Sequence, residues 1–180
     1  MKRTFSIGGV HPADNKISRG CAIETLPTPP TVYISVSQHI GAPAKPIVAV
    51  GDKVLTGQPI AEPGGFVSAY IHSSVSGTVK SIGPRKDLAG NMPTCIEIQV
   101  EGDEWMENID RTDTLVTEFT DDNKVIMDKI KMGGVVGLGG ATFPTHVKLT
   151  PPPGKKCDML IINGCECEPY LTSDFRTLLE

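Results

Sequence analysis

Short apolar and alternating runs separated by glycine turns fill residues 31–100 of the chain. In residues 31–36 polar and apolar side chains alternate, so that Val32, Ile34 and Val36 would share one face of a strand. Similar runs recur with glycines between them, and the further strands that they predict are residues 47–52, 53–60, 66–71, 76–82 and 95–100. Many short strands joined by glycine turns are typical of a small β-sandwich or barrel.

A helical pattern replaces the strand pattern after residue 101. Apolar side chains in residues 112–131 recur at helical spacing, and Ile126 and Ile130 would share one helix face. The polar residues 121–123 interrupt this pattern, and an Asp or Asn there would cap a second helix. We therefore expect one or two helices that lead into a glycine-rich segment, residues 133–140.

The glycine-rich segment carries five glycines in eight residues and is followed by Phe143 and Pro144. Glycine has no Cβ, so the run allows positive φ angles and lets backbone N–H groups approach a ligand closely. Pro144 suits the first position of a helix, and a helix over residues 144–149 would direct its positive end at the glycines. This arrangement predicts a cradle for an anion or a phosphate.

An apolar run and a polar turn follow the cradle. Residues 159–162 have the length and character of a strand, and the turn after them carries Asn163, Glu166 and Glu168. Ligands of α/β sheets bind beyond the carboxyl ends of strands, so the turn and the glycines are expected to face one site. The prolines before this strand predict an extended elbow, and residues 171–180 are expected to be helical.

The glycine spacing alone leaves two interpretations open, a nucleotide site and a flexible loop between domains. The sequence Gly137-Leu138-Gly139-Gly140 lacks the third glycine of the dinucleotide-binding fingerprint, and no Gly-Lys-Ser/Thr follows as in a P-loop. The net charge of −4 and the aromatic content of 5% disfavour nucleic-acid binding, which needs clustered basic charge and stacking platforms. No apolar run approaches the roughly 20 residues that span a bilayer, so membrane association is expected only through partners.

The five cysteines are expected to be reduced thiols of a cytoplasmic protein, because no secretory signal precedes them. Cys165 and Cys167 form a C-x-C motif with Cys157 upstream, which supplies fewer ligands than a zinc or iron–sulfur site normally uses. We therefore expect no metal site, and Cys165 and Cys167 are interpreted as thiols that line the site. His11 and His72 are interpreted as surface or packed side chains rather than catalytic ones.

Taken together, the motifs resemble a known family. GLGGATFPTHVKL (residues 137–149) followed by NGCECEPYLTSDFRTLLE (residues 163–180) resembles the RnfC component of the Rnf electron-transport complex. More distantly it resembles the NADH-binding flavoprotein subunit of respiratory complex I, which reads Gly-x-Gly-Gly-x-Gly-Phe-Pro-x-x-x-Lys and then Asn-x-x-Glu-x-Glu-Pro. GGVHPADNK (residues 8–16), residues 37–60 and SVSGTV (residues 74–79) also look like RnfC, so the resemblance covers nearly the whole chain.

The resemblance implies a mixed α+β chain in four parts. These are an N-terminal arm (1–30), a barrel-sandwich hybrid domain of the biotinyl/lipoyl type (31–102), a helical connector (103–132), and the beginning of an α/β FMN/NADH-binding domain (133–180). One strand and its flanks make a poor α/β domain. The chain is therefore expected to be a fragment of a longer protein, or to complete its sheet with another polypeptide.

The loop residues of the implied cofactor site match the family pattern position by position. Gly137, Gly139 and Gly140 match the glycines that line flavin and nicotinamide. Phe143 matches the aromatic residue that flanks the nucleotide base, and Lys148 matches the lysine near the flavin phosphate.

The turn residues Asn163, Glu166 and Glu168 match the polar turn that contacts flavin and NADH. No catalytic side chain is expected, because in such a site the flavin carries the chemistry. The chain departs from the complex I pattern at three positions, where a basic residue, a glycine and an acid are replaced by Leu138, Thr142 and Cys165.

The family implies an electron-transfer subunit that binds FMN and NAD(H). It would pass electrons between NADH and ferredoxin through flavin and 4Fe-4S clusters, coupled to ion translocation. The clusters are expected outside this chain, and the isolated chain is expected to be inactive. The implied partners are the other subunits of a membrane complex, which would hold the protein peripherally on the inner face of the cell membrane.

Two other functions remain open. The chain could be a docking module of a larger complex with no bound nucleotide. A lipoyl- or biotin-type carrier is disfavoured, because residues 63–70 contain no lysine to modify, whereas Lys53 and Lys80 lie within the strand pattern.

Overall fold

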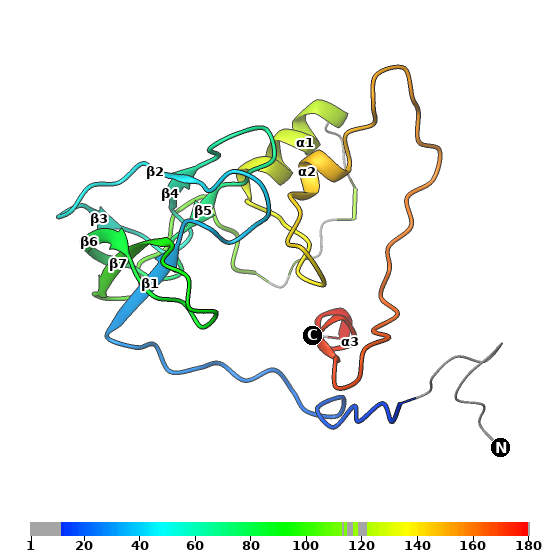
Figure 1. Cartoon of the computed structure of the whole chain (residues 1–180), viewed down its shortest axis with the longest axis horizontal. Coiled ribbons are helices and arrows are strands. Elements are labelled where there is room, and N and C mark those ends of the chain that lie inside the picture. The colour runs from blue at the N-terminus through cyan, green and yellow to red at the C-terminus, as the bar shows by residue number, and fades with distance from the viewer. Residues whose placement is uncertain (1–11, 113, 115–116, 119–121, 180) are drawn as a thin grey trace. The chain divides into compact units, whose positions relative to one another are not determined.

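The computed structural model describes residues 12–112, 114, 117–118 and 122–179 (Figure 1). The predictions for His11 and for part of a first helix in residues 112–120 lie outside the described residues. The chain divides into two compact units, Thr28–Lys156 and the pair of segments Met1–Pro27 and Cys157–Glu180.

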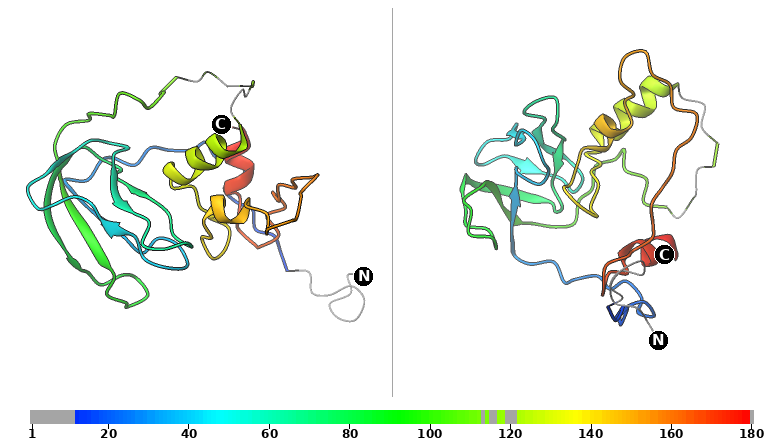
Figure 2. Two further views of the ribbon diagram at one scale, coloured as in Figure 1. Left: turned by 90° about the horizontal axis from the view of Figure 1, so that it is seen from above. Right: turned by 45° about the vertical axis from the view of Figure 1, so that its right-hand side comes forward.

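Two antiparallel sheets form the β-domain of the first unit (Figures 1 and 2). The four-stranded sheet has the order β1–β7–β6–β3, with bounds Thr31–Ser35, Thr94–Val100, Gly77–Pro84 and Lys53–Val54. The three-stranded sheet has the order β2–β4–β5, with bounds Lys45–Pro46, Pro59–Glu62 and Ile71–His72. This two-sheet arrangement with few helices confirms the predicted small mixed fold.

The core of the β-domain follows from strand alternation. Ile96 and Ile98 of β7 are fully buried, whereas Glu97 between them accepts hydrogen bonds from the hydroxyls of Tyr33 and Ser81 on the neighbouring strands. The second sheet contributes Ile60 and Ala61, which are also fully buried. Burial of each of these isoleucine side chains stabilises the fold by about 1.5–3 kcal/mol.

The strand predictions are confirmed for β1, β6 and β7 and need correction in the middle of the domain. Residues 47–52 are not a strand, and the predicted strand 53–60 is split into β3 and the start of β4. Residues 66–70 form a loop, because the carbonyl of Val67 accepts from Ala42 N–H at 3.0 Å and the Ser68 hydroxyl accepts from Gly64 N–H at 3.0 Å. These loop bonds take the place of a ladder with a neighbouring strand.

Helix α1 (Asn123–Met132) confirms the predicted second helix and its cap. The Asp122 carboxylate accepts a hydrogen bond from Val125 N–H at 2.9 Å, as an N-cap should. After the helix, Gly134 takes a φ of 65°, and a Cβ there would lie 2.4 Å from the Tyr70 carbonyl oxygen. Only glycine therefore allows this close approach of the segment after α1 to Tyr70, which precedes β5.

Helix α2 (Thr145–Lys148) is a single turn that lies beside α1 and starts directly after Pro144 (Figures 1 and 2). It is shorter than the predicted helix 144–149, because Pro144 is the N-cap residue and Leu149 the C-cap residue.

In the second unit, helix α3 (Ser173–Leu179) confirms the predicted terminal helix. The predicted strand 159–162 is wrong. These residues are extended without ladder partners, and Leu160 and Ile162 are 67% and 81% exposed. A strand requires a neighbour for its N–H and C=O groups, and among the described residues none lies beside this run.

Candidate functional site

The glycine-rich segment forms a hydrogen-bonded loop at the end of α1. Val136 and Pro144 form an antiparallel bridge, and Gly137 N–H donates to the Phe143 carbonyl at 3.0 Å. One step outward, Thr145 N–H donates to the Val135 carbonyl at 2.9 Å. The loop of residues 137–143 is therefore closed at its base, and α2 begins where it ends.

The outer glycines of this loop present bare backbone. Gly139 and Gly140 are exposed, and a Cβ on either would meet no heavy atom within 4 Å. Their φ angles lie outside the left-handed region, so the expected positive φ is not found at the loop glycines. It occurs instead at Gly134 and at Thr142, whose φ is 51°. These glycines thus leave space for a ligand rather than permit a special turn.

The side chain of Lys148 brings a positive charge close to the loop backbone. Its ammonium nitrogen lies 3.2 Å from the position of a Cβ on Gly137. Helix α2 has only one turn, so its dipole contributes less than the sequence predicted, because the macrodipole sums over aligned peptides. Lys148 at the end of α2 can therefore neutralise an anion bound at the loop.

His146 lies on the same helical turn as Lys148. Burial lowers the pKa of His146, and the positive charge of Lys131 lowers it further. Its Nδ1 is buried without a hydrogen-bond partner among the described residues. Both effects disfavour a positive charge on His146 beside the loop.

The polar turn is built largely by its own side chains. The Asn163 amide oxygen accepts from Cys165 N–H at 3.0 Å, and the Glu166 carboxylate accepts from Asp174 N–H of α3 at 2.7 Å. Glu168 is exposed, and the Cys167 thiol donates to its carboxylate at 3.6 Å. Of the two carboxylate residues of the turn, Glu168 is exposed and Glu166 is half-buried.

The structure brings together only part of the predicted site. Gly137, Phe143 and Lys148 meet at the loop, with the exposed Gly139 and Gly140 at its tip; Asn163, Glu166 and Glu168 belong to the other compact unit. Whether these residues bind a cofactor stays a prediction.

The residue that the sequence analysis missed is Lys16. Its ammonium donates hydrogen bonds to three backbone carbonyls of the polar turn, which belong to Glu166, Glu168 and Leu171. The available signal was the GGVHPADNK motif, which ends at Lys16 and has no role in the predicted site.

The cysteines form no metal-binding cluster in the described part of the chain. No group of three His, Cys, Asp or Glu side chains there could hold a metal ion. Cys157, Cys165 and Cys167 are exposed free thiols, and Cys95 is buried in the β-domain. Among the described helices, none combines the length and the apolar character required to cross a bilayer.

The residues around the loop are chemically compatible with the phosphate end of a flavin mononucleotide. Exposed backbone at Gly139 and Gly140 allows close approach, and the Lys148 ammonium matches the charge of a phosphate. Phe143 is half-buried and is the last residue of the loop, so it can supply an aromatic surface to a ring system. The donor set is thus compatible with a phosphorylated aromatic cofactor.

Comparison with known families assigns the two parts of the chain separately. The RnfC barrel sandwich hybrid domain matches residues 4–103, and the Nuo51 FMN-binding domain matches residues 130–180. The second match contains the glycine loop, α2 and the polar turn.

Three curated relatives match over almost the whole chain, and each is the C component of an ion-translocating oxidoreductase complex. The relative from the proton-translocating ferredoxin:NAD(+) oxidoreductase complex of Clostridium ljungdahlii is 49% identical over 100% of this chain and 39% of its own length. Its Na(+)-translocating counterpart from Acetobacterium woodii is 44% identical over 95% of this chain and 38% of its own. The relative from the ion-translocating oxidoreductase complex of Rhodobacter capsulatus is 41% identical over 99% of this chain and 34% of its own length. The chain thus spans less than two-fifths of these relatives.

Proposed function

Since the chain belongs to the RnfC family, we propose that it supplies the barrel-sandwich domain and part of the FMN-binding region of an electron-transfer subunit. The proposed whole protein passes electrons between NADH and ferredoxin and couples this transfer to ion translocation. The names of the relatives from Clostridium ljungdahlii and Acetobacterium woodii support this interpretation, since both describe ferredoxin:NAD(+) oxidoreductase complexes. The 4Fe-4S clusters are proposed to lie outside this chain.

The observation that carries the proposal is the loop of residues 137–143 with Lys148 beside it. In this proposal the backbone of Gly139 and Gly140 lies against the cofactor, and Lys148 neutralises its phosphate. Phe143 packs against a ring of the bound nucleotide. The bound flavin would supply the hydride-accepting and one-electron chemistry. The chain itself holds and orients it.

The polar turn is proposed to contact the ribose and the flavin edge. Glu168 is exposed and can accept hydrogen bonds from sugar hydroxyls. Asn163 and Glu166 act more indirectly, because their side chains already bond Cys165 N–H and Asp174 N–H. The partners in this proposal are the other subunits of the membrane complex, through which the protein associates peripherally with the membrane.

The experiment that tests this proposal compares Gly139→Val with Gly83→Val in the natural polypeptide, purified within its complex. Gly83 is a matched control, because it also has open space around a Cβ and an ordinary φ but lies in β6. Wild type and Gly83→Val should contain FMN and show NADH-dependent bleaching of flavin absorbance. Gly139→Val should lose FMN while the complex still assembles. A wild-type complex without FMN at this subunit contradicts the proposal.

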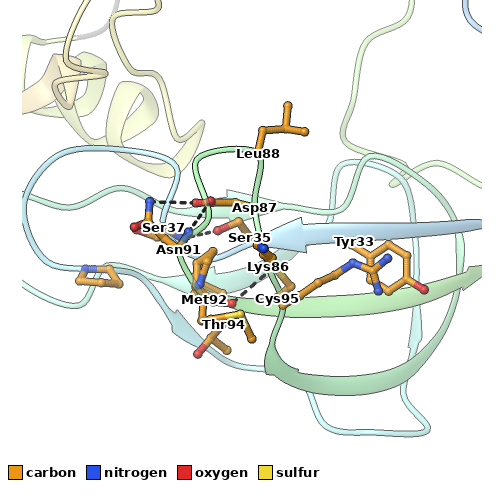
Figure 3. A pocket seen from close by; sticks show the side chains of 14 residues that line it. Tyr33, Ser35, Ser37, Lys86, Asp87, Leu88, Asn91, Met92, Thr94 and Cys95 are labelled. Carbon is orange, nitrogen blue, oxygen red and sulfur yellow. Dashed lines mark hydrogen bonds between the residues drawn. The ribbon is translucent and has the colours of Figure 1, made fainter.

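A second candidate function is docking, and one feature of the β-domain favours it. The turn between β6 and β7 borders a depression of about 700 Å³ (Figure 3). Leu88 is fully exposed at the tip, where its side chain points away from the turn, and Met92 is 59% exposed. The Arg85 guanidinium stacks on Tyr33, and Asp87 accepts from Asn91 N–H at 2.8 Å, so the turn is preorganised.

Leu88→Asp separates the two functions. If docking occurs through this turn, the variant dissociates from the other subunits but keeps FMN. If the variant remains in the complex with full NADH-dependent flavin reduction, the turn is not a docking surface.

A further inference from the structure

We propose that Lys16 is a positioning residue for the nucleotide-binding turn. Its ammonium fixes the backbone of residues 166–171, so that the Glu168 carboxylate is presented to the cofactor in one geometry. The inference rests on the proposed function for what the turn binds. Its structural part stands on contacts within one compact unit, which joins Met1–Pro27 to Cys157–Glu180.

The contacts of Lys16 account for the whole donor capacity of its side chain. An ammonium has three N–H donors and no acceptor. The Lys16 ammonium donates to the carbonyls of Glu166, Glu168 and Leu171, and its distance to the Glu168 carbonyl oxygen is 2.9 Å. These bonds are charge-assisted and therefore stronger than those between neutral groups. Because each donor already has a carbonyl, Lys16 acts on the shape of the turn and not as a direct ligand of a phosphate.

Neighbouring residues of the same motif support the contact. The Asp14 carbonyl accepts from Tyr170 N–H at 2.9 Å, and the hydroxyls of Ser18 and Thr172 are hydrogen-bonded at 2.7 Å. The segment from Asp14 to Ser18 thus lies alongside the turn from Glu166 to Thr172. Lys16 is the middle residue of this segment. The end of the GGVHPADNK motif therefore holds the polar turn by hydrogen bonds.

The backbone of the turn needs such support. Glu166 has a φ of 46° and Tyr170 a φ of 69°, in the left-handed region that residues other than glycine rarely adopt. Such conformations persist where the surroundings over-determine them, and they are frequent at ligand-binding sites. Two of the carbonyls held by Lys16 belong to Glu166 itself and to Leu171, which follows Tyr170. Lys16 therefore restrains the peptide group that follows Glu166. Its other two bonds hold the peptide groups after Glu168 and after Leu171, one position removed from Tyr170 on each side.

The test uses Lys16→Met and Lys16→Arg in the natural polypeptide within its complex. Lys155→Met is the control, because Lys155 is exposed and lies in the other compact unit. The first readout is amide hydrogen exchange without added nucleotide. Its reporters are the N–H groups of Cys165, Tyr170 and Asp174, which are hydrogen-bonded in the turn. Lys16→Met should raise their exchange rates about tenfold or more.

The second readout separates positioning from folding. With Lys16→Met, the KM for NADH should rise at least about fivefold, because the Glu168 contact is no longer preorganised, and FMN content should change less. Lys16→Arg should recover part of both effects, since guanidinium keeps the charge but cannot direct three converging donors in the same way. Lys155→Met should match wild type in both readouts.

Three results distinguish the inference from the proposed function. Unchanged exchange in Lys16→Met overturns the positioning role. Faster exchange with unchanged KM shows that Lys16 only stabilises the fold, which also overturns the inference. A wild-type complex that neither holds FMN nor oxidises NADH contradicts the proposed function, and this result is visible before any Lys16 variant is made.

Discussion

The Lys148 ammonium lies 3.2 Å from the point at which a Cβ on Gly137 would stand. Gly137 begins the loop of residues 137–143, and Lys148 ends helix α2, which follows the loop. The loop closes because Gly137 N–H donates to the Phe143 carbonyl, and this brings the cation over the glycine backbone. A Cβ at residue 137 would require the ammonium to move by a few tenths of an ångström.

Lys148→Met should weaken FMN binding about tenfold or more, because a charged hydrogen bond to a phosphate contributes about 1.5–3 kcal/mol. Riboflavin lacks the phosphate, so its affinity should be the same in wild type and variant. Titration of both ligands by fluorescence quenching measures the difference. Lys124→Met, on the exposed face of α1, is the charge-matched control and should bind FMN normally. An equal loss for FMN and riboflavin would show that Lys148 does not contact the phosphate.

Thr142→Gly should stabilise the protein. The φ of 51° at Thr142 costs a β-branched residue about 1–2 kcal/mol, whereas the extra chain entropy of glycine costs about 0.5–1 kcal/mol. The net gain should be on the order of 0.5–1 kcal/mol in the free energy of unfolding, measured by urea denaturation. Thr142→Ala keeps a Cβ and should bring no gain. Equal stability of the Gly and Ala variants would mean that the strain at residue 142 is absent in solution.

Gly134→Ala should be strongly destabilising. The added Cβ would stand 2.4 Å from the Tyr70 carbonyl oxygen, at a φ of 65°. The combined overlap and backbone strain should cost about 2–4 kcal/mol in the free energy of unfolding. The adjacent Gly133 has an ordinary helical φ of −69°, so Gly133→Ala is the control and should cost less than about 1 kcal/mol. Similar losses in both variants would argue against the close contact between Gly134 and the Tyr70 carbonyl.

The stability of the β-domain should fall as the pH drops below about 6.5. Burial lowers the pKa of His72, and a hydrogen bond with the Met132 backbone offsets this only in part. The unfolded chain therefore binds a proton more readily than the folded one. The contribution of His72 to the free energy of unfolding is thus fully present above the pKa of the unfolded chain and is lost as the pH falls below it. His146 has the same sign of shift and adds to the slope.

His72→Gln should reduce this pH dependence between about pH 7.5 and pH 5.5, a window in which most carboxylates stay ionised. Urea denaturation at several pH values gives the slope. A double variant with His146→Gln should flatten the profile further. If His72→Gln has the same dependence of the free energy of unfolding on pH as the wild type, the pKa of His72 is not lowered in the folded protein.

The longer strands are predictable from sequence, and the two-residue strands are not. β1, β6 and β7 each carry enough alternation to mark a buried face, as Ile96 and Ile98 do on either side of Glu97. β2, β3 and β5 have two residues each, which is too few for any periodicity. Their positions depend on loop contacts such as that between Ala42 N–H and the Val67 carbonyl, which no local pattern encodes.

The candidate site shows the same division. The loop and α2 follow from local signals, namely the glycines and Pro144. The interaction of Lys16 with the polar turn joins segments from opposite ends of the chain, so no spacing rule could find it. The internal use of the Glu166 carboxylate is equally invisible, because it depends on where α3 begins. The resemblance to a family identified Glu166 as a candidate ligand contact, whereas in the structure its carboxylate binds the N–H of Asp174.

The pairing of β1 with β7 has a consequence for how the β-domain folds. The first strand of the domain lies against the last, with Thr31 opposite Gln99 and Ser35 opposite Cys95. β6 and β7, in contrast, are neighbours in sequence and form a hairpin. Closing the long loop costs more entropy than closing the hairpin, so the hairpin can form early whereas β1 joins last. During synthesis β1 emerges first and must wait for β7, which exposes its apolar face to other chains until the domain is complete.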